Sequence, residues 1–237
     1  MKFQERLNES FPGAVTEEDF VQATHRILSQ KGFTSDNAIA CVGVCRDEIT
    51  QPLVERVRKT WGEAFNFSSL AGMLFLGKTG FSAAEQHAPD EEEKERYVFF
   101  ALPHIAIYTN GEIGVCRRAG RKNTSSACGA LLAFKKELDE GRVQLGLDVN
   151  DVEQSLIRMR LLQEIPYGQV PDLLSLTQTT LRVIQSDLKR MIDLTVQTDR
   201  SDYAVFTGIQ IHGPDGNYIW PALCYNVVNG AQEEIAI

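Results

Sequence analysis

The chain has 237 residues, of which 43% are hydrophobic and 24% charged, and its formal net charge is −8. An acidic chain of this kind is a poor partner for nucleic acid, because phosphate contacts need clusters of Lys and Arg. No apolar run approaches the roughly 20 residues that span a bilayer, so we expect no membrane partner. The five cysteines are few and odd in number, which argues against a disulfide scaffold and for a reducing compartment.

The N-terminal residues lack the basic segment and apolar core that mark a secretory signal. We therefore predict a cytoplasmic protein, or a protein of the plastid stroma if a transit peptide has been removed.

Helical and strand-like patterns follow one another along the chain. Thr16 and the three acidic residues after it are typical of a helix start, and Asn110-Gly111 is typical of a hairpin turn. In chain order we predict a helix beginning at 16, a buried strand over 37–44, a helix over 52–61, a loop or short helices over 70–88, a strand over 97–108 that returns over 113–117, a helix capped by Ser125 or Ser126 and running to about 138, helices near 151–164 and 172–196, and a hairpin of 203–212 with 218–228.

The chain shows no internal repeat and no long linker. These elements predict one α/β domain with a central mixed β-sheet flanked by helices. Within it we distinguish an N-terminal helical region (1–36), a core that holds the candidate ligands (37–140), and C-terminal helices with a hairpin (141–237).

Three side chains of the kind that ligate metals lie at or near element ends. Cys45 follows the first buried strand, His104 lies within the second, and Cys128 falls in the first turn of a predicted helix. Ligands bind outside the carboxyl ends of strands in open α/β sheets, and a helix N-terminus favours a thiolate. Zinc takes thiolate and imidazole ligands, three of them in catalytic sites. The long spacing leaves a blander interpretation open, in which all three are ordinary core residues of a metal-free domain.

Four segments occur together in a familiar order: GVCRDE at 43–48, GKTGF at 77–81, FFALPHI at 99–105 and SSACGAL at 125–131. In this set the chain resembles the limiting-CO2-inducible protein B (LCIB) family, which is similar to the β- and θ-class carbonic anhydrases. The resemblance implies a fold like that of the β-class, a homodimer, and Zn2+ held by Cys45, His104 and Cys128. It also implies reversible hydration of carbon dioxide to bicarbonate by zinc-bound hydroxide. Some members of the family lack this activity, so an inactive zinc-binding scaffold in CO2 concentration is the alternative.

Asp47 and two further residues complete the predicted active site. The Cys45-x-Asp47 pattern matches the opening of the β-class motif, in which an arginine two residues after the aspartate pairs with it. Ile49 occupies that position here, so the predicted partner is Arg46. Such a pair keeps Asp47 ionised and off the metal; an unpaired Asp47 could become the fourth ligand. His87 is the predicted proton carrier, because its ordinary pKa is near 6.5, although an ordinary loop histidine explains it equally well.

Several other features receive a structural interpretation. Residues 72–79 fit the phosphate-loop pattern GxxxxGK[ST], but their bulky apolar residues favour a buried turn and make nucleotide binding a remote alternative. The basic residues at 117, 118, 121 and 122 could attract bicarbonate or an acidic partner, and a solvated loop is the favoured interpretation. His25 and His212 are assigned to the surface or to structure.

Overall fold

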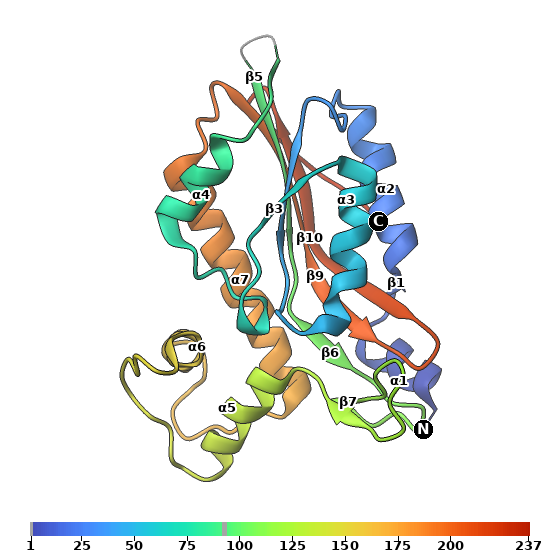
Figure 1. The fold of residues 1–237 in the computed structure, drawn as a ribbon, viewed down its shortest axis with the longest axis vertical. Coiled ribbons are helices and arrows are strands. Elements are labelled where there is room, and N and C mark those ends of the chain that lie inside the picture. The colour runs from blue at the N-terminus through green and yellow to red at the C-terminus, as the bar shows by residue number, and fades with distance from the viewer. Residues whose placement is uncertain (1, 92–93) are drawn as a thin grey trace.

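A twisted β-sheet runs through the molecule between two layers of helices (Figure 1). The computed structural model describes residues 2–91 and 94–237. In chain order the elements are α1 (Phe3–Ser10), β1 (Val15–Thr16), α2 (Glu17–Ser29), β2 (Ile39–Gly43), the 3-10 helix η1 (Glu48–Thr50), α3 (Gln51–Trp61), β3 (Ala64–Asn66), the 3-10 helix η2 (Leu70–Gly72), α4 (Gly77–Glu85), β4 (Asp90–Glu91), β5 (Lys94–Ala101), β6 (His104–Ala106), β7 (Val115–Cys116), β8 (Ser125–Ser126), α5 (Gly129–Asp139), α6 (Val152–Leu162), α7 (Leu173–Thr195), β9 (Ser201–His212), β10 (Asn217–Val228) and β11 (Ala231–Glu234).

The sheet is mixed, as the sequence predicted. Its strand order is β1-β10-β9-β5-β2-β3. The strands β3, β2, β5 and β9 are parallel to one another, whereas β10 pairs antiparallel with β9 through the predicted hairpin. Parallel strands end at the same edge of a sheet, so the residues that follow β2 and β5 are brought together there.

Side chains on the two faces of the sheet pack against different helices. Val42, Phe100 and Phe206 belong to the apolar cluster that contains α2 and α3. Their neighbours along the strands belong to a second cluster, which contains α4 and α7. Both faces are therefore buried, which explains why β2 is apolar throughout instead of alternating. Among the described residues, no helix combines the length and apolar character that crossing a membrane requires.

The predicted strand over 97–108 is two strands in the structure. β5 ends at Ala101 and β6 begins at His104, where the chain pairs with β9. Pro103 lies between them and has no N–H to donate to a ladder, while its carbonyl accepts a hydrogen bond from Gln210 N at 3.0 Å. The break places His104 at the first residue of a strand instead of inside one.

The helix predicted to begin at Ser125 or Ser126 begins later. Both serines form β8, which pairs with β7, and α5 starts at Gly129 with Cys128 at its N-cap. Strand pairing therefore takes the residues that were expected to cap the helix. Cys128 precedes the first turn instead of lying within it.

The apolar segment at 70–88 forms the short helices η2 and α4, one of the two predicted outcomes. Gly72 has a φ of +75°, and a Cβ there would lie 2.6 Å from the carbonyl oxygen of Leu102. Met73 and Leu74 are buried in the core. This close packing beside the β5–β6 break disfavours a phosphate loop, which needs exposed backbone N–H groups.

Candidate metal centre

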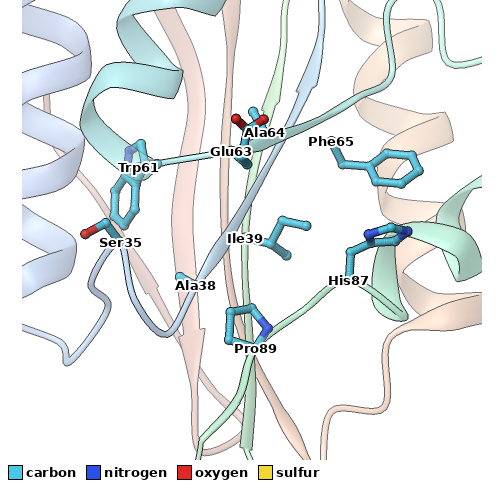
Figure 2. Close-up of a pocket in the computed structure, with 9 residues that line it drawn as sticks. All are labelled: Ser35, Ala38, Ile39, Trp61, Glu63, Ala64, Phe65, His87 and Pro89. Atoms are coloured by element: carbon cyan, nitrogen blue, oxygen red, sulfur yellow. The ribbon is translucent and has the colours of Figure 1, made fainter.

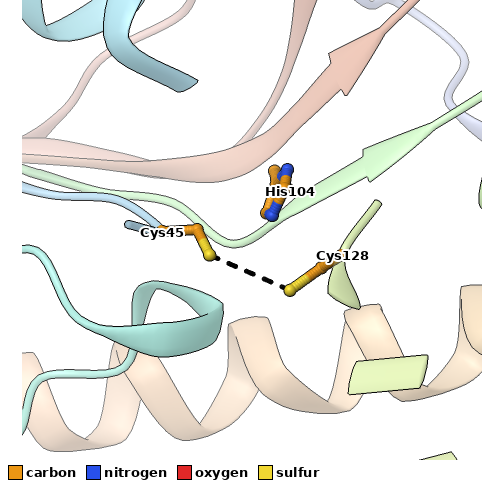
Figure 3. Close-up of side chains that lie close together, drawn as sticks. All are labelled: Cys45, His104 and Cys128. Carbon is orange, nitrogen blue, oxygen red and sulfur yellow. Dashed lines mark hydrogen bonds between the residues drawn. The ribbon is translucent and has the colours of Figure 1, made fainter. Parts of the chain in front are cut away.

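The three predicted ligands come from three separate elements and meet at the carboxyl edge of the sheet. Cys45 lies two residues beyond β2, where it forms a parallel bridge with Ser69. His104 is the first residue of β6, and Cys128 is the N-cap residue of α5. Figure 3 shows the three side chains converging on one point.

The spacing of the ligand atoms suits a tetrahedral metal ion. The two sulfurs and a nitrogen of His104 lie within 4.8 Å of one another, and the Sγ atoms of Cys45 and Cys128 are 3.9 Å apart. A disulfide would need about 2.05 Å. Two thiolates on a tetrahedral zinc ion, with bonds of about 2.3 Å, lie about 3.8 Å apart. The side chains are 3%, 0% and 1% exposed in chain order, so the pocket for the ion is shielded from solvent.

His104 directs one ring nitrogen to the candidate metal position and the other to a second histidine. Its Nδ1 lies 3.1 Å from Nε2 of His212, while its own Nε2 is buried with no hydrogen-bond partner in the part of the chain that the structure describes. An unsatisfied buried ring nitrogen is costly unless a ligand completes it. Together with two sulfurs, it forms a donor set that zinc prefers.

The two cysteines influence one another's ionisation. The hydrogen bond with Cys128 lowers the pKa of Cys45, and His104 lowers it further. The same hydrogen bond raises the pKa of Cys128, as does burial, although backbone N–H groups at the start of α5 oppose both effects. The pair therefore loses its protons in two separate steps. A cation bound between the sulfurs would favour loss of the second proton.

Arg118 is the partner of Asp47. It donates from Nη1 to Oδ1 at 2.5 Å and from Nη2 to Oδ2 at 3.0 Å. Further hydrogen bonds to Ser125 and Ser126 hold the guanidinium in place. Burial raises the pKa of Asp47, but the hydrogen bonds from Arg118, together with smaller contributions from Glu48, His104 and the Ile49 N–H, lower it to about 2. Asp47 is therefore an ionised, oriented acceptor beside the candidate ligands.

The predicted pairing of Asp47 with Arg46 is wrong. Arg46 directs its guanidinium to Glu153 of α6, with Nη2 and Oε1 at 2.7 Å. Glu153 also accepts from the backbone N–H of Leu70. The neighbouring position in sequence does not bring Arg46 to Asp47, because successive side chains after a strand diverge.

His87 lies away from the other candidate residues. It lines a pocket of about 430 Å³ with Ile39 and Phe65 (Figure 2). Ile39 is the first residue of β2, whereas Cys45 lies beyond its last, so the strand separates them by roughly 20 Å. The structure does not bring His87 to the site that it was expected to serve.

Two residues at the site were not singled out by sequence reasoning. Arg118 belongs to the basic group predicted to be a solvated loop, yet its side chain is only 21% exposed. His212 was assigned to structure and lies directly behind His104. The cluster of basic residues drew attention to Arg118 but did not indicate that its side chain points inward. Nothing in the sequence near His212 indicates its contact with a residue 108 positions away.

The fold and the site together define an α/β protein with a buried Cys-His-Cys cluster that could hold a metal, beside an Asp–Arg pair. A sequence model of the family described as limiting CO2-inducible proteins B/C, beta carbonic anhydrases, matches residues 14–228. The crystal structure of limiting CO2-inducible protein LCIB is 36% identical, with a TM-score of 0.80 over 97% of both chains. The structure of PtLCIB4, a homolog of LCIB, is 24% identical, with a TM-score of 0.83 over 98% of both chains. No curated protein matches the chain.

The chain therefore belongs to the family of limiting CO2-inducible proteins B/C, whose description places it among the beta carbonic anhydrases.

Proposed function

We propose that this protein is a zinc enzyme that catalyses the reversible hydration of carbon dioxide to bicarbonate. The observation that carries the proposal is the buried donor set of Cys45, His104 and Cys128 beside an Asp47 that Arg118 holds by both oxygens. Three protein ligands leave the fourth position of a tetrahedral ion open, as in catalytic zinc sites. Asp47 does not have to fill that position, because its oxygens are already engaged.

Each residue has a distinct part in this reaction. Zinc, when bound, lowers the pKa of water from about 15.7 towards 7 and so supplies a nucleophile at neutral pH. The Asp47 carboxylate accepts a hydrogen bond from the attacking water and orients its lone pair towards the carbon of CO2. Arg118 keeps that carboxylate ionised and fixed. Ala71 and Met73 belong to the same apolar cluster as both cysteines, an environment suited to a small apolar substrate.

Metal content and CO2 hydration should be measured on one preparation. We expect about one zinc per chain and stopped-flow rates well above buffer. Asp47→Asn keeps the shape of the side chain but removes its charge, so we expect activity to fall by about 10²-fold or more with zinc retained. Glu48→Gln is the matched control, because Glu48 also accepts from Arg118 but is 71% exposed.

The outcomes separate the competing interpretations. CO2 hydration at the background rate in a folded, zinc-replete sample would show that the protein is a zinc-binding scaffold and not an enzyme. Well under one zinc per chain, in protein never exposed to a chelator, would leave a metal-free domain.

The apolar surface around α6 supports the proposed homodimer. Of the nine most exposed large apolar side chains in the described part of the chain, seven lie between Leu145 and Val170. Exposed apolar patches of this kind mark interaction sites. We expect light scattering after gel filtration to give the mass of two chains, and Leu147→Glu with Val149→Glu to give one. Leu194→Glu, at the end of α7, should leave the dimer intact. A single-chain mass for the unaltered protein would contradict the proposal.

The cysteines support a location in the cytoplasm or the plastid stroma. All five thiols are free and buried. We propose a reducing compartment on this basis, since zinc-ligating thiolates must stay unoxidised to bind. Localisation of the tagged protein by fluorescence would distinguish the two compartments.

A further inference from the structure

A chain of buried polar side chains runs from His104 away from the candidate metal centre. His104 Nδ1 lies 3.1 Å from His212 Nε2, and His212 Nδ1 lies 2.9 Å from Asn217 Oδ1. The Asn217 side chain is hydrogen-bonded in turn to the carboxylate of Glu17. Glu17, His104 and His212 are all at least 96% buried, so bulk water is not the partner that satisfies them.

The fold brings these four residues together from separate elements. His212 and Asn217 face each other across the β9–β10 hairpin as register partners. β1 pairs with β10 beside them, and Glu17 is the first residue of the helix that follows β1. β6 pairs with β9, which places His104 near His212.

The hydrogen-bonding capacity of each group fixes the direction of every proton in this chain. Gln210 donates to Glu17 at 2.6 Å and Arg56 approaches it at 3.7 Å. Burial raises the pKa of Glu17, whereas Gln210, Asn217 and Arg56 lower it. Asn217 presents Oδ1 to His212 Nδ1, and an amide oxygen only accepts, which leaves the amide N–H to donate to Glu17. His212 then carries its proton on Nδ1, and its Nε2 can only accept.

The last link determines the tautomer of His104. Since His212 Nε2 accepts, His104 must donate from Nδ1. A neutral imidazole has one N–H, so Nε2 of His104 carries a bare lone pair. This nitrogen is buried and has no hydrogen-bond partner among the described residues. Since Nδ1 is turned to His212, Nε2 is the nitrogen left for the candidate metal site.

We propose that Glu17, Asn217 and His212 are positioning residues, which hold the ring of His104 in the Nδ1–H tautomer with Nε2 ready to bind a metal. This inference rests on the proposed zinc site, but it concerns the protein's own hydrogen bonds. Partners behind a ligating histidine fix its orientation and raise its basicity, and losing them typically weakens metal binding about 10- to 100-fold.

The role of this hydrogen-bonded chain can be tested by the zinc affinity of two His212 variants, measured by competition with a chromophoric chelator. His212→Phe keeps a planar ring but removes the acceptor, so we expect about 10- to 100-fold weaker zinc binding. His212→Gln restores an acceptor for His104 and a donor for Asn217, so affinity should largely recover. His87→Phe, which removes an imidazole at the other end of the sheet, is the control and should bind as the unaltered protein does. Equal affinity of His212→Phe and the unaltered protein would overturn the proposal.

A second measurement needs no variant and no activity. In protein labelled with ¹⁵N-histidine, NMR should show His104 and His212 both protonated on Nδ1 and unprotonated on Nε2. A proton on Nε2 of either ring would overturn the proposal. This readout does not depend on bound zinc. An unaltered chain that binds no zinc would therefore contradict the proposed function, while the tautomers of His104 and His212 would still test the positioning role.

Discussion

Cys45→Ala is expected to empty the metal centre, lowering the zinc content from about one per chain to near zero and CO2 hydration to the buffer rate. The variant leaves one thiolate and one imidazole, too few to hold a tetrahedral ion against water. We expect the affinity to fall by more than the 10- to 100-fold typical of partners outside the ligand shell. Elemental analysis and stopped-flow hydration on the same sample measure both effects.

Cys41→Ala provides a matched control within β2, the strand that precedes Cys45. Cys41 lies four residues before Cys45 and is completely buried, but its side chain belongs to the core beside α4 and α7 and not to the ligand set. Its loss removes a small apolar group, so we expect a modest loss of stability with normal zinc content. Zinc retained in Cys45→Ala, or lost equally from Cys41→Ala, would contradict the assignment of the ligands.

The elements that local sequence patterns determine were predictable. The apolar run at 37–44 and the turn around Asp215 identify strands and a hairpin that the structure contains. The break at Pro103 and the late start of α5 were missed. In both places the outcome depends on strand pairing: His104 pairs with β9, which is distant in sequence, and Ser125 pairs with β7 across the loop between them. Propensity near the residue carries no information about such partners.

The candidate site was likewise predicted in part, and the residues that were missed depend on long-range contacts. Resemblance to a family, together with the positions of Cys45 at a strand end and Cys128 at a helix start, predicted the cluster of Cys45, His104 and Cys128. The supporting residues were not predicted, because Arg118 and His212 reach their partners across 71 and 108 residues. The nearest arginine in sequence was the wrong partner for Asp47, since side-chain direction and not sequence distance decides which charges meet.

Arg118→Ala should have the second large effect, because it removes both donors to Asp47. Without these donors the pKa of the carboxylate rises from about 2 towards its ordinary value, and a freed Asp47 can turn to the metal as a fourth ligand. We expect CO2 hydration to fall about 10²- to 10³-fold while zinc is retained. Arg118→Lys keeps the charge but offers no bidentate geometry, so an intermediate rate is expected.

Arg117→Ala is the control for this variant, because the neighbouring arginine donates to the Tyr108 hydroxyl and not to Asp47. It should hydrate CO2 at the unaltered rate. Full activity in Arg118→Ala would show that Asp47 needs no arginine, and loss of zinc from that variant would show that the ion pair acts on the metal site itself.

The pH dependence of stability gives an independent readout of the same pair. The pKa of Asp47 is about 2 in the folded protein, below the value of about 3.9 in an unfolded chain. A carboxyl group with a lowered pKa stabilises the fold fully above its unfolded pKa, and this contribution is lost as the pH falls towards the folded value. The stability difference between the unaltered protein and Arg118→Ala, about 1–2 kcal/mol, should therefore be constant from pH 7 to about 5 and shrink below about pH 4. Urea unfolding across this range measures it. A difference that stays constant down to about pH 3 would mean that Arg118 stabilises the fold without holding Asp47 ionised.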